Sequence, residues 1–210
     1  MTKKQRAVLA VERLKQLYPE AICSLNYSSA WQLLVATRLS AQCTDARVNL
    51  VTPALFERYP TMYEMAKADV DEVGKLIYSC GFYKTKSKDL VELSRLLVEH
   101  YAGIIPDTVE ELTKLPGVGR KTANLVVGDV YGKPAVVTDT HCIRITNRLG
   151  LAEGEVPVKV EQQLRAVLPA EESNDFCHRL VLFGRDVCAA RSPKCATCPL
   201  QDICKNKAKK

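Results

Sequence analysis

The sequence has no long apolar run. No segment approaches the roughly 20 consecutive apolar residues that a membrane-spanning helix requires. Near the N-terminus the apolar residues 7–11 are followed at once by Glu12 and Arg13. This run is too short for the core of a secretory signal peptide. We therefore expect a cytoplasmic protein that does not associate with a membrane.

Strand patterns are also scarce. Residues 135–137 (Ala-Val-Val) are the only credible extended stretch, and we find no internal repeat or low-complexity block. Apolar residues instead recur at three- and four-residue steps, which is typical of amphipathic helices. The predicted helices cover residues 5–18, 29–39, 45–59, 69–79, 87–101, 107–115, 121–130, 139–149, 159–168 and 173–187. This pattern predicts an all-α protein of about ten helices.

Acidic residues are fewer than basic residues. Lys and Arg together number 30 and Asp and Glu 24, and the isoelectric point is about 8.8. Such a surplus permits a polyanionic partner without requiring one. The chain has 210 residues, of which 47% are hydrophobic, enough for one or two domains with a buried core.

The cysteines do not form an even set. There are nine, and nothing marks the chain for secretion, so a disulfide framework is disfavoured. Four of them form a C-x6-C-x2-C-x5-C array near the C-terminus: Cys188, Cys195, Cys198 and Cys204. Thiolates gathered in this way suit a soft metal centre. Structural zinc sites pair ligands more closely on both arms, so we predict an iron–sulfur cluster, [4Fe-4S] before [2Fe-2S], with zinc as the alternative.

A glycine-rich turn lies between two predicted helices. Residues 115–121 read Leu-Pro-Gly-Val-Gly-Arg-Lys, and two glycines allow a sharp turn and a close approach to a ligand. Backbone amides at the start of the following helix favour an anion. The glycine and Lys-Ser/Thr spacing of a phosphate-binding P-loop is absent, and simple helix packing is the alternative.

The residues around this turn add a resemblance. Residues 115–119 resemble the helix-hairpin-helix motif, which grips DNA backbone phosphate without reading sequence. Residues 120–123 (Arg-Lys-Thr-Ala), residues 137–141 (Val-Thr-Asp-Thr-His) and the cysteine array follow in order. Residues 40–45 (Ser-Ala-Gln-Cys-Thr-Asp) also match, with cysteine where alanine is common. Over nearly its whole length, the chain resembles the endonuclease III family of DNA glycosylases.

The resemblance implies an architecture. It implies two helical lobes with a DNA-binding cleft between them, a helix-hairpin-helix motif and a C-terminal [4Fe-4S] cluster loop. Residues 22–133 would form a helical barrel domain that includes the hairpin. Residues 1–21 and 134–210 would form the second helical domain with the cluster.

The resemblance also implies an activity. The chain would be a DNA N-glycosylase and abasic-site lyase of base excision repair, with Lys121 as nucleophile and Asp139 as the essential carboxylate. It would remove oxidised pyrimidines and cleave the strand by β-elimination through a lysine Schiff base. Its partner would be double-stranded DNA with damaged pyrimidines or abasic sites. We expect a monomer in the bacterial or archaeal cytosol, associated with the nucleoid.

The chemistry suits these two residue types. An amine attacks the sugar C1′ only when uncharged, and free lysine is almost fully protonated at neutral pH. Lys121 would lie just inside a helix N-terminus, whose dipole disfavours a cation by about 0.3–1 kcal/mol. Desolvation in a cleft filled by DNA must therefore supply most of the free energy that favours the uncharged amine. Asp139 would accept the proton and stabilise the positive sugar transition state.

Further residues are expected to contact DNA. An excising enzyme must flip the target nucleotide out of the duplex, and inserted side chains offset part of the unstacking cost. By resemblance, Gln42 fills the gap and the turn at Gly81 and Phe82 is a wedge, although Phe82 as a core aromatic is an equal alternative. His141 would line the pocket or contact phosphate, although a structural role is the alternative. The remaining expected contacts are Gly117, Gly119, Arg120, Arg191 and Lys194.

Three other functions compete. An adenine-specific mismatch glycosylase shares the motifs but generally lacks lysine at the position of Lys121. A thymine-mismatch glycosylase would need only small changes in the pocket. A non-enzymatic DNA-binding or electron-carrying module would have no need of Lys121 together with Asp139.

Overall fold

The computed structural model describes residues 1–206, and every regular element within them is a helix. The α-helices are α1 (Lys3–Leu17), α2 (Ala30–Ser40), α3 (Asp45–Arg58), α4 (Met62–Met65), α5 (Val70–Leu76), α6 (Tyr83–Tyr101), α7 (Val109–Leu112), α8 (Arg120–Asp129), α9 (Thr140–Leu149), α10 (Pro157–Arg165) and α11 (Ser173–Asp186). Three 3₁₀ turns are η1 (Tyr78–Cys80), η2 (Ala170–Glu172) and η3 (Cys195–Thr197). The predicted all-α class is confirmed, and residues 135–137 are buried but form no strand.

The chain divides into two compact units. One comprises Ser24–Tyr131 and is called the internal unit; the other joins Met1–Cys23 to Gly132–Lys210 and is called the terminal unit. Within residues 1–206, none of the helices combines the length and the apolar character that crossing a bilayer requires.

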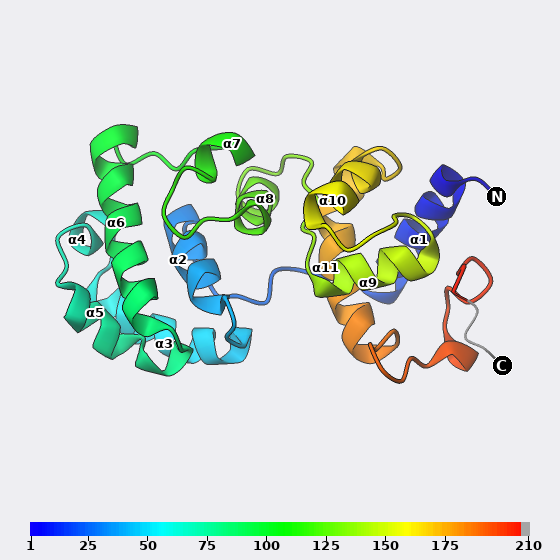
Figure 1. Cartoon of the computed structure of the whole chain (residues 1–210), viewed down its shortest axis with the longest axis horizontal. Coiled ribbons are helices and arrows are strands. Elements are labelled where there is room, and N and C mark those ends of the chain that lie inside the picture. The colour runs from blue at the N-terminus through cyan, green and yellow to red at the C-terminus, as the bar shows by residue number, and fades with distance from the viewer. Residues whose placement is uncertain (207–210) are drawn as a thin grey trace. The chain divides into compact units, whose positions relative to one another are not determined.

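Helix α2 is the centre of the internal unit. It contacts α3, α6 and α8, and α6 lies along one side of it (Figure 1). A helix with neighbours on several sides must be apolar around most of its circumference. Its buried residues are Trp31, Leu33, Leu34, Val35, Ala36, Thr37 and Leu39. The indole of Trp31 keeps a partner inside this core, because its Nε1 donates to Ser94 Oγ at 3.1 Å.

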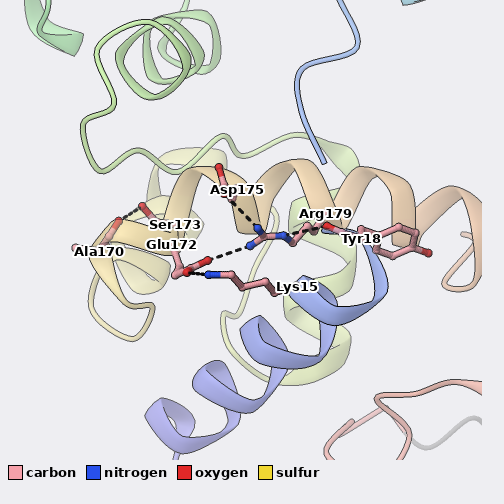
Figure 2. Close-up of polar contacts among 7 residues, drawn as sticks. All are labelled: Lys15, Tyr18, Ala170, Glu172, Ser173, Asp175 and Arg179. Carbon is pink, nitrogen blue, oxygen red and sulfur yellow. Dashed lines mark hydrogen bonds and ion pairs between the residues drawn. The ribbon is translucent and has the colours of Figure 1, made fainter. Parts of the chain in front are cut away.

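In the terminal unit, α11 packs against α1 and α9. A buried arginine of α11 connects parts of this unit. The side chain of Arg179 is only 3% exposed and donates to Glu172 at 3.0 Å and to Asp175 at 3.1 Å (Figure 2). Its Nε also donates to the carbonyl oxygen of Tyr18 at 3.3 Å, and Lys15 pairs with Glu172. These bonds satisfy a charge that burial would otherwise penalise, and they tie the end of α1 to α11.

Two helices begin at threonine caps. From the sequence, either Thr44 or Asp45 suits the N-cap of α3, and Asp107 suits the N-cap of α7. Thr44 caps α3, its side chain accepting from the amide of Arg47 at 3.3 Å. The prediction of Asp107 as the cap of α7 is wrong. Thr108 is the cap, and it accepts from the amide of Glu111 at 3.3 Å. Aspartate and threonine both suit an N-cap. With the helix starting one residue later than predicted, Val109 and Leu112 are buried in the core.

Candidate functional site

The glycine-rich turn connects α7 to α8 in the internal unit. Gly117 has a φ of 70°, in the left-handed region that favours glycine. A Cβ atom at this position would lie 2.5 Å from Cδ and from Nε of Arg38. Gly117 is therefore required twice, by its backbone conformation and by the arginine packed against it.

An ion pair lies against this turn. Arg38, in α2, donates from Nε to Oδ2 of Asp89, in α6, at 2.8 Å, and its Nη2 lies 2.6 Å from the same oxygen. Both side chains are mostly buried, at 14% and 21% exposure. Because the pair joins two helices of the core, it gives the glycine turn a rigid base.

The second glycine faces open space. Gly119 is the N-cap of α8, and a Cβ atom built on it would meet nothing within 4 Å. Glycine has no side chain with which to accept from the first amides of the helix, so these amides can serve an external acceptor. Arg120 and Lys121 follow in the first turn, and both are exposed. This geometry suits an anion such as a DNA phosphate.

Asp139 is the N-cap of α9, in the terminal unit. Its Oδ1 accepts a hydrogen bond of 2.6 Å from the amide of Cys142, which is fully buried. The predicted position at a helix start is confirmed. The cap fixes one carboxylate oxygen toward the helix, and the positive end of the helix dipole favours the anion.

His141 lies in the first turn of the same helix. Its Nδ1 lies 3.1 Å from Nη2 of Arg144, and a Cβ on Gly184 of α11 would approach that nitrogen to 2.2 Å. The imidazole is therefore packed against the backbone of α11. These contacts favour the structural alternative for His141, and its contact with DNA remains a prediction.

Two exposed residues adopt unusual backbone conformations. Gln42 has a φ of 54° and Phe82 a φ of 45°, although neither is glycine. Non-glycine residues rarely adopt this region, and such strain concentrates at functional sites. Phe82 is 67% exposed, so the alternative that it is a core aromatic is wrong. The two side chains line one open pocket, together with Arg38, Ala41, Thr85 and Lys86.

The four cysteines of the C-terminal array surround one cavity. Its lining also includes the apolar residues Ile145, Leu149, Phe183, Val187, Pro193 and Leu200. Burial raises the pKa of the Cys198 and Cys204 thiols. A raised pKa means that forming the thiolate costs more free energy. Coordination of the thiolate by a metal centre offsets this cost.

The donor set suits a soft metal centre. All four thiols of the array line the one cavity. Four thiolates are the ligand set of an iron–sulfur cluster and also of a tetrahedral zinc site.

Two arginines of α9 hold the cysteine segment. Arg144 donates to the carbonyl oxygen of Cys188 at 3.0 Å. Arg148 donates to Cys188 Sγ at 3.2 Å and to the carbonyl oxygens of Ala189 and Ala190, both at 2.8 Å. The carbonyl oxygen of Arg148 in turn accepts from the Cys204 thiol at 3.3 Å. No sequence signal identifies the role of either arginine, because their i, i+4 spacing places them on one helix face but does not identify their partners.

The loop between the first two ligands is basic and exposed. Arg191 and Lys194 are both exposed, and the amide of Lys194 donates to the carbonyl oxygen of Val187 at 2.9 Å. Because Cys188 and Cys195 close this loop, a cluster bound by both cysteines would fix its shape.

Comparison with known families assigns these features to base excision repair. The family model for HhH-GPD superfamily base excision DNA repair proteins matches residues 35–170. The model for the iron–sulfur binding domain of endonuclease III matches residues 188–204, which span the four cysteines.

Individual proteins narrow the assignment. Endonuclease III of Synechocystis sp. is 48% identical over 97% of this chain and 93% of its own length. Endonuclease III of Bacillus subtilis is 42% identical over 95% of this chain and 92% of its own length. A solved structure of a trapped covalent endonuclease III–DNA intermediate, the estranged-adenine complex, superposes with a TM-score of 0.91. It is 40% identical and covers 98% of this chain and 97% of its own.

The chain belongs to the endonuclease III family. This confirms the predicted family, the iron–sulfur cofactor and the activity class, a bifunctional DNA glycosylase and abasic-site lyase that acts on damaged pyrimidines.

Proposed function

We propose that Lys121 is the nucleophile of this enzyme and that Asp139 is its essential carboxylate. The glycosidic bond between C1′ and an oxidised pyrimidine breaks as Lys121 Nζ bonds to C1′, and the departing base takes up a proton. Opening of the sugar ring then gives a Schiff base. Loss of a C2′ proton from this intermediate breaks the 3′ C–O bond, which cleaves the strand.

The position of Lys121 carries this proposal. It is an exposed amine in the first turn of α8, two residues after the glycine whose open face suits a phosphate. A backbone phosphate bound at that turn would bring the neighbouring sugar within reach of a lysine side chain. Proximity of this kind accounts for much of a catalytic rate.

Asp139 would serve the same reaction electrostatically. A carboxylate favours the positive charge that develops on the sugar as the base leaves, and it is a candidate acceptor for the proton of the attacking amine. Its hydrogen bond to the Cys142 amide holds it in one orientation. A carboxylate that need not reorganise is more effective in the transition state.

The other DNA contacts divide into two roles. Gly117, Gly119 and Arg120 would hold a phosphate at the turn. Arg191, Lys194 and His141, in the terminal unit, would contact phosphate or the nucleotide. Gln42 and Phe82, with Gly81 allowing the turn, would enter the duplex where the damaged nucleotide leaves it. Binding through phosphates predicts affinity that falls steeply with salt. We further propose that the enzyme works as a monomer in the cytosol, at the nucleoid.

Borohydride trapping tests the nucleophile. The parent and Lys121→Gln are incubated with a duplex containing thymine glycol, and covalent protein–DNA product is measured after reduction. Lys159→Gln, which removes an exposed lysine of α10, is the matched control. We expect trapped product from the parent and the control only. Equal trapping by Lys121→Gln would assign the nucleophile to another amine.

A further inference from the structure

Two cysteines lie beside the segments proposed to enter the duplex. Cys43 directly follows Gln42, and Cys80 precedes the turn at Gly81 and Phe82. The two segments are far apart in the sequence, one between α2 and α3 and the other between η1 and α6. Gln42 and Phe82 nevertheless line one pocket, so the segments meet in the internal unit.

A buried lysine holds these segments together. Lys86 is 1% exposed, and its Nζ donates to the carbonyl oxygens of Leu39 and Cys80, each at 2.8 Å. Leu39 lies in the last turn of α2, which leads to Gln42, and Cys80 ends the turn that leads to Phe82. Burial lowers the pKa of Lys86. One ammonium group therefore sets the spacing of the two segments.

The side chains of Cys43 and Cys80 lie within interaction distance of each other in this region. Cys80 is buried, at 2% exposure, whereas Cys43 is partly exposed. Burial, followed by the proximity of Cys43, raises the pKa of Cys80 to about 11. Cys80 thus stays a protonated thiol, and Cys43 is the sulfur that solvent reaches.

Two cations lie near this pair. Lys86 and Arg47 both lie close enough to act electrostatically on the Cys80 sulfur, and Lys86 also interacts with Cys43. An accessible sulfur next to a second thiol is typical of cysteines that oxidise reversibly.

We propose that Cys43 and Cys80 form a modification site that a hydroperoxide converts to an intramolecular disulfide. The peroxide oxidises Cys43 Sγ to a sulfenic acid, and the peroxide itself is reduced to an alcohol or to water. Cys80 Sγ then attacks that sulfur and displaces hydroxide, which leaves as water with the Cys80 proton. The two thiols together lose two electrons and two protons to the peroxide.

The disulfide would oppose DNA binding. The two sulfurs must approach to about 2.05 Å to form the bond. This contraction pulls on the residues next to Gln42 and Phe82, which already occupy a strained backbone region. The effect on activity rests on the proposed role of these two side chains, whereas formation of the bond does not.

Peptide mapping tests the bond itself. Reduced, cluster-loaded protein is treated with limiting hydrogen peroxide, blocked with N-ethylmaleimide and digested without reductant. We expect one linked peptide that joins Cys43 to Cys80 and disappears with dithiothreitol. Cys142 and Cys177 are the internal control, because they also lie within interaction distance of each other but are only 0% and 3% exposed. An unlinked Cys43, or linkage of the control pair at the same peroxide dose, would overturn the proposal.

Excision measurements test the consequence. The parent is expected to lose at least about tenfold of its excision rate on a thymine glycol duplex after oxidation, and to regain it with dithiothreitol. Cys43→Ala, which introduces the residue common in the family, should start with the parent's rate and keep it. Absorption spectra of both proteins, recorded before and after oxidation, check that the cluster is retained equally. Equal losses in both would refute the regulatory effect, whereas a reduced parent without excision would instead refute the proposed function.

Discussion

Arg148 donates a hydrogen bond from Nη1 to the Sγ of Cys188 at 3.2 Å, and so connects helix α9 to the first cysteine of the array. The same helix begins at Asp139, whose carboxylate caps it. One short helix therefore carries the proposed catalytic carboxylate at its start and holds the cluster segment at its end.

Replacing this arginine should loosen the cluster. Arg148→Met removes the bond to Cys188 Sγ and leaves two carbonyl oxygens without their donor. Outer-shell partners of metal ligands typically contribute about 10–100-fold in metal affinity. We expect faster loss of iron to a chelator, measured by visible absorption and iron content. Arg95→Met, at an exposed pair in α6, is the control. Parent-like retention would mean that the cysteines alone hold the cluster.

Two substitutions separate the two roles of Asp139. Asp139→Asn keeps an oxygen that can accept from the Cys142 amide but removes the charge, whereas Asp139→Ala removes both. We expect both variants to lose about 10²–10⁴-fold in single-turnover excision. Only Asp139→Ala should also lose about 1 kcal/mol of stability to urea. Normal excision by Asp139→Asn would show that the residue is only a cap.

The glycines of the turn should respond differently to alanine. Gly117→Ala meets Arg38 and a left-handed backbone, so it should destabilise the fold by about 1–3 kcal/mol. Gly119→Ala has room, so it should lose at most about 1 kcal/mol of stability from its poorer N-cap. It should nevertheless weaken duplex binding, because its methyl group stands where a phosphate would approach. Urea unfolding and binding titrations measure both. Unchanged binding by Gly119→Ala would place the phosphate elsewhere.

The Glu172 contacts predict a pH dependence of stability. A hydrogen bond from Lys15, with a second from Arg179, holds the pKa of this carboxyl below its usual value of 4.5. A carboxyl whose pKa is lower in the folded state than in the unfolded state stabilises the fold at pH values above its unfolded-state pKa. This stabilisation is lost as the pH falls through the folded-state pKa. Lys15→Met should therefore be less stable than the parent near neutral pH, by up to about 1 kcal/mol because Lys15 is 56% exposed. The difference should shrink below about pH 4.5 in urea unfolding. A difference that grows with acid would contradict this account.

Much of the fold could be predicted because local patterns determine it. Apolar periodicity located the long helices, and the residue types at Thr44 and Asp139 identified two caps. The four-residue helix Met62–Met65 was missed, because a single turn contains too few residues to show a period. Helix α6 begins at Tyr83, before the predicted residue 87, and its N-cap Phe82 makes no side-chain cap bond that would mark the start.

The candidate site was predictable only where a motif spans neighbouring residues. The turn around Gly117 and the four cysteines are such motifs, and the four cysteines do line one cavity. Arg148 and Lys86 act on residues 40 and 47 positions away, and no local pattern identifies these partners. The exposure of Phe82 likewise depends on tertiary packing.

The identity of the trapped residue tests the central claim most directly. After borohydride reduction on a thymine glycol duplex, the protein–DNA product is digested, and the peptide that carries the deoxyribose remnant is sequenced by tandem mass spectrometry. We predict that the remnant is attached to Nζ of Lys121. Attachment to any other amine would contradict the proposed mechanism.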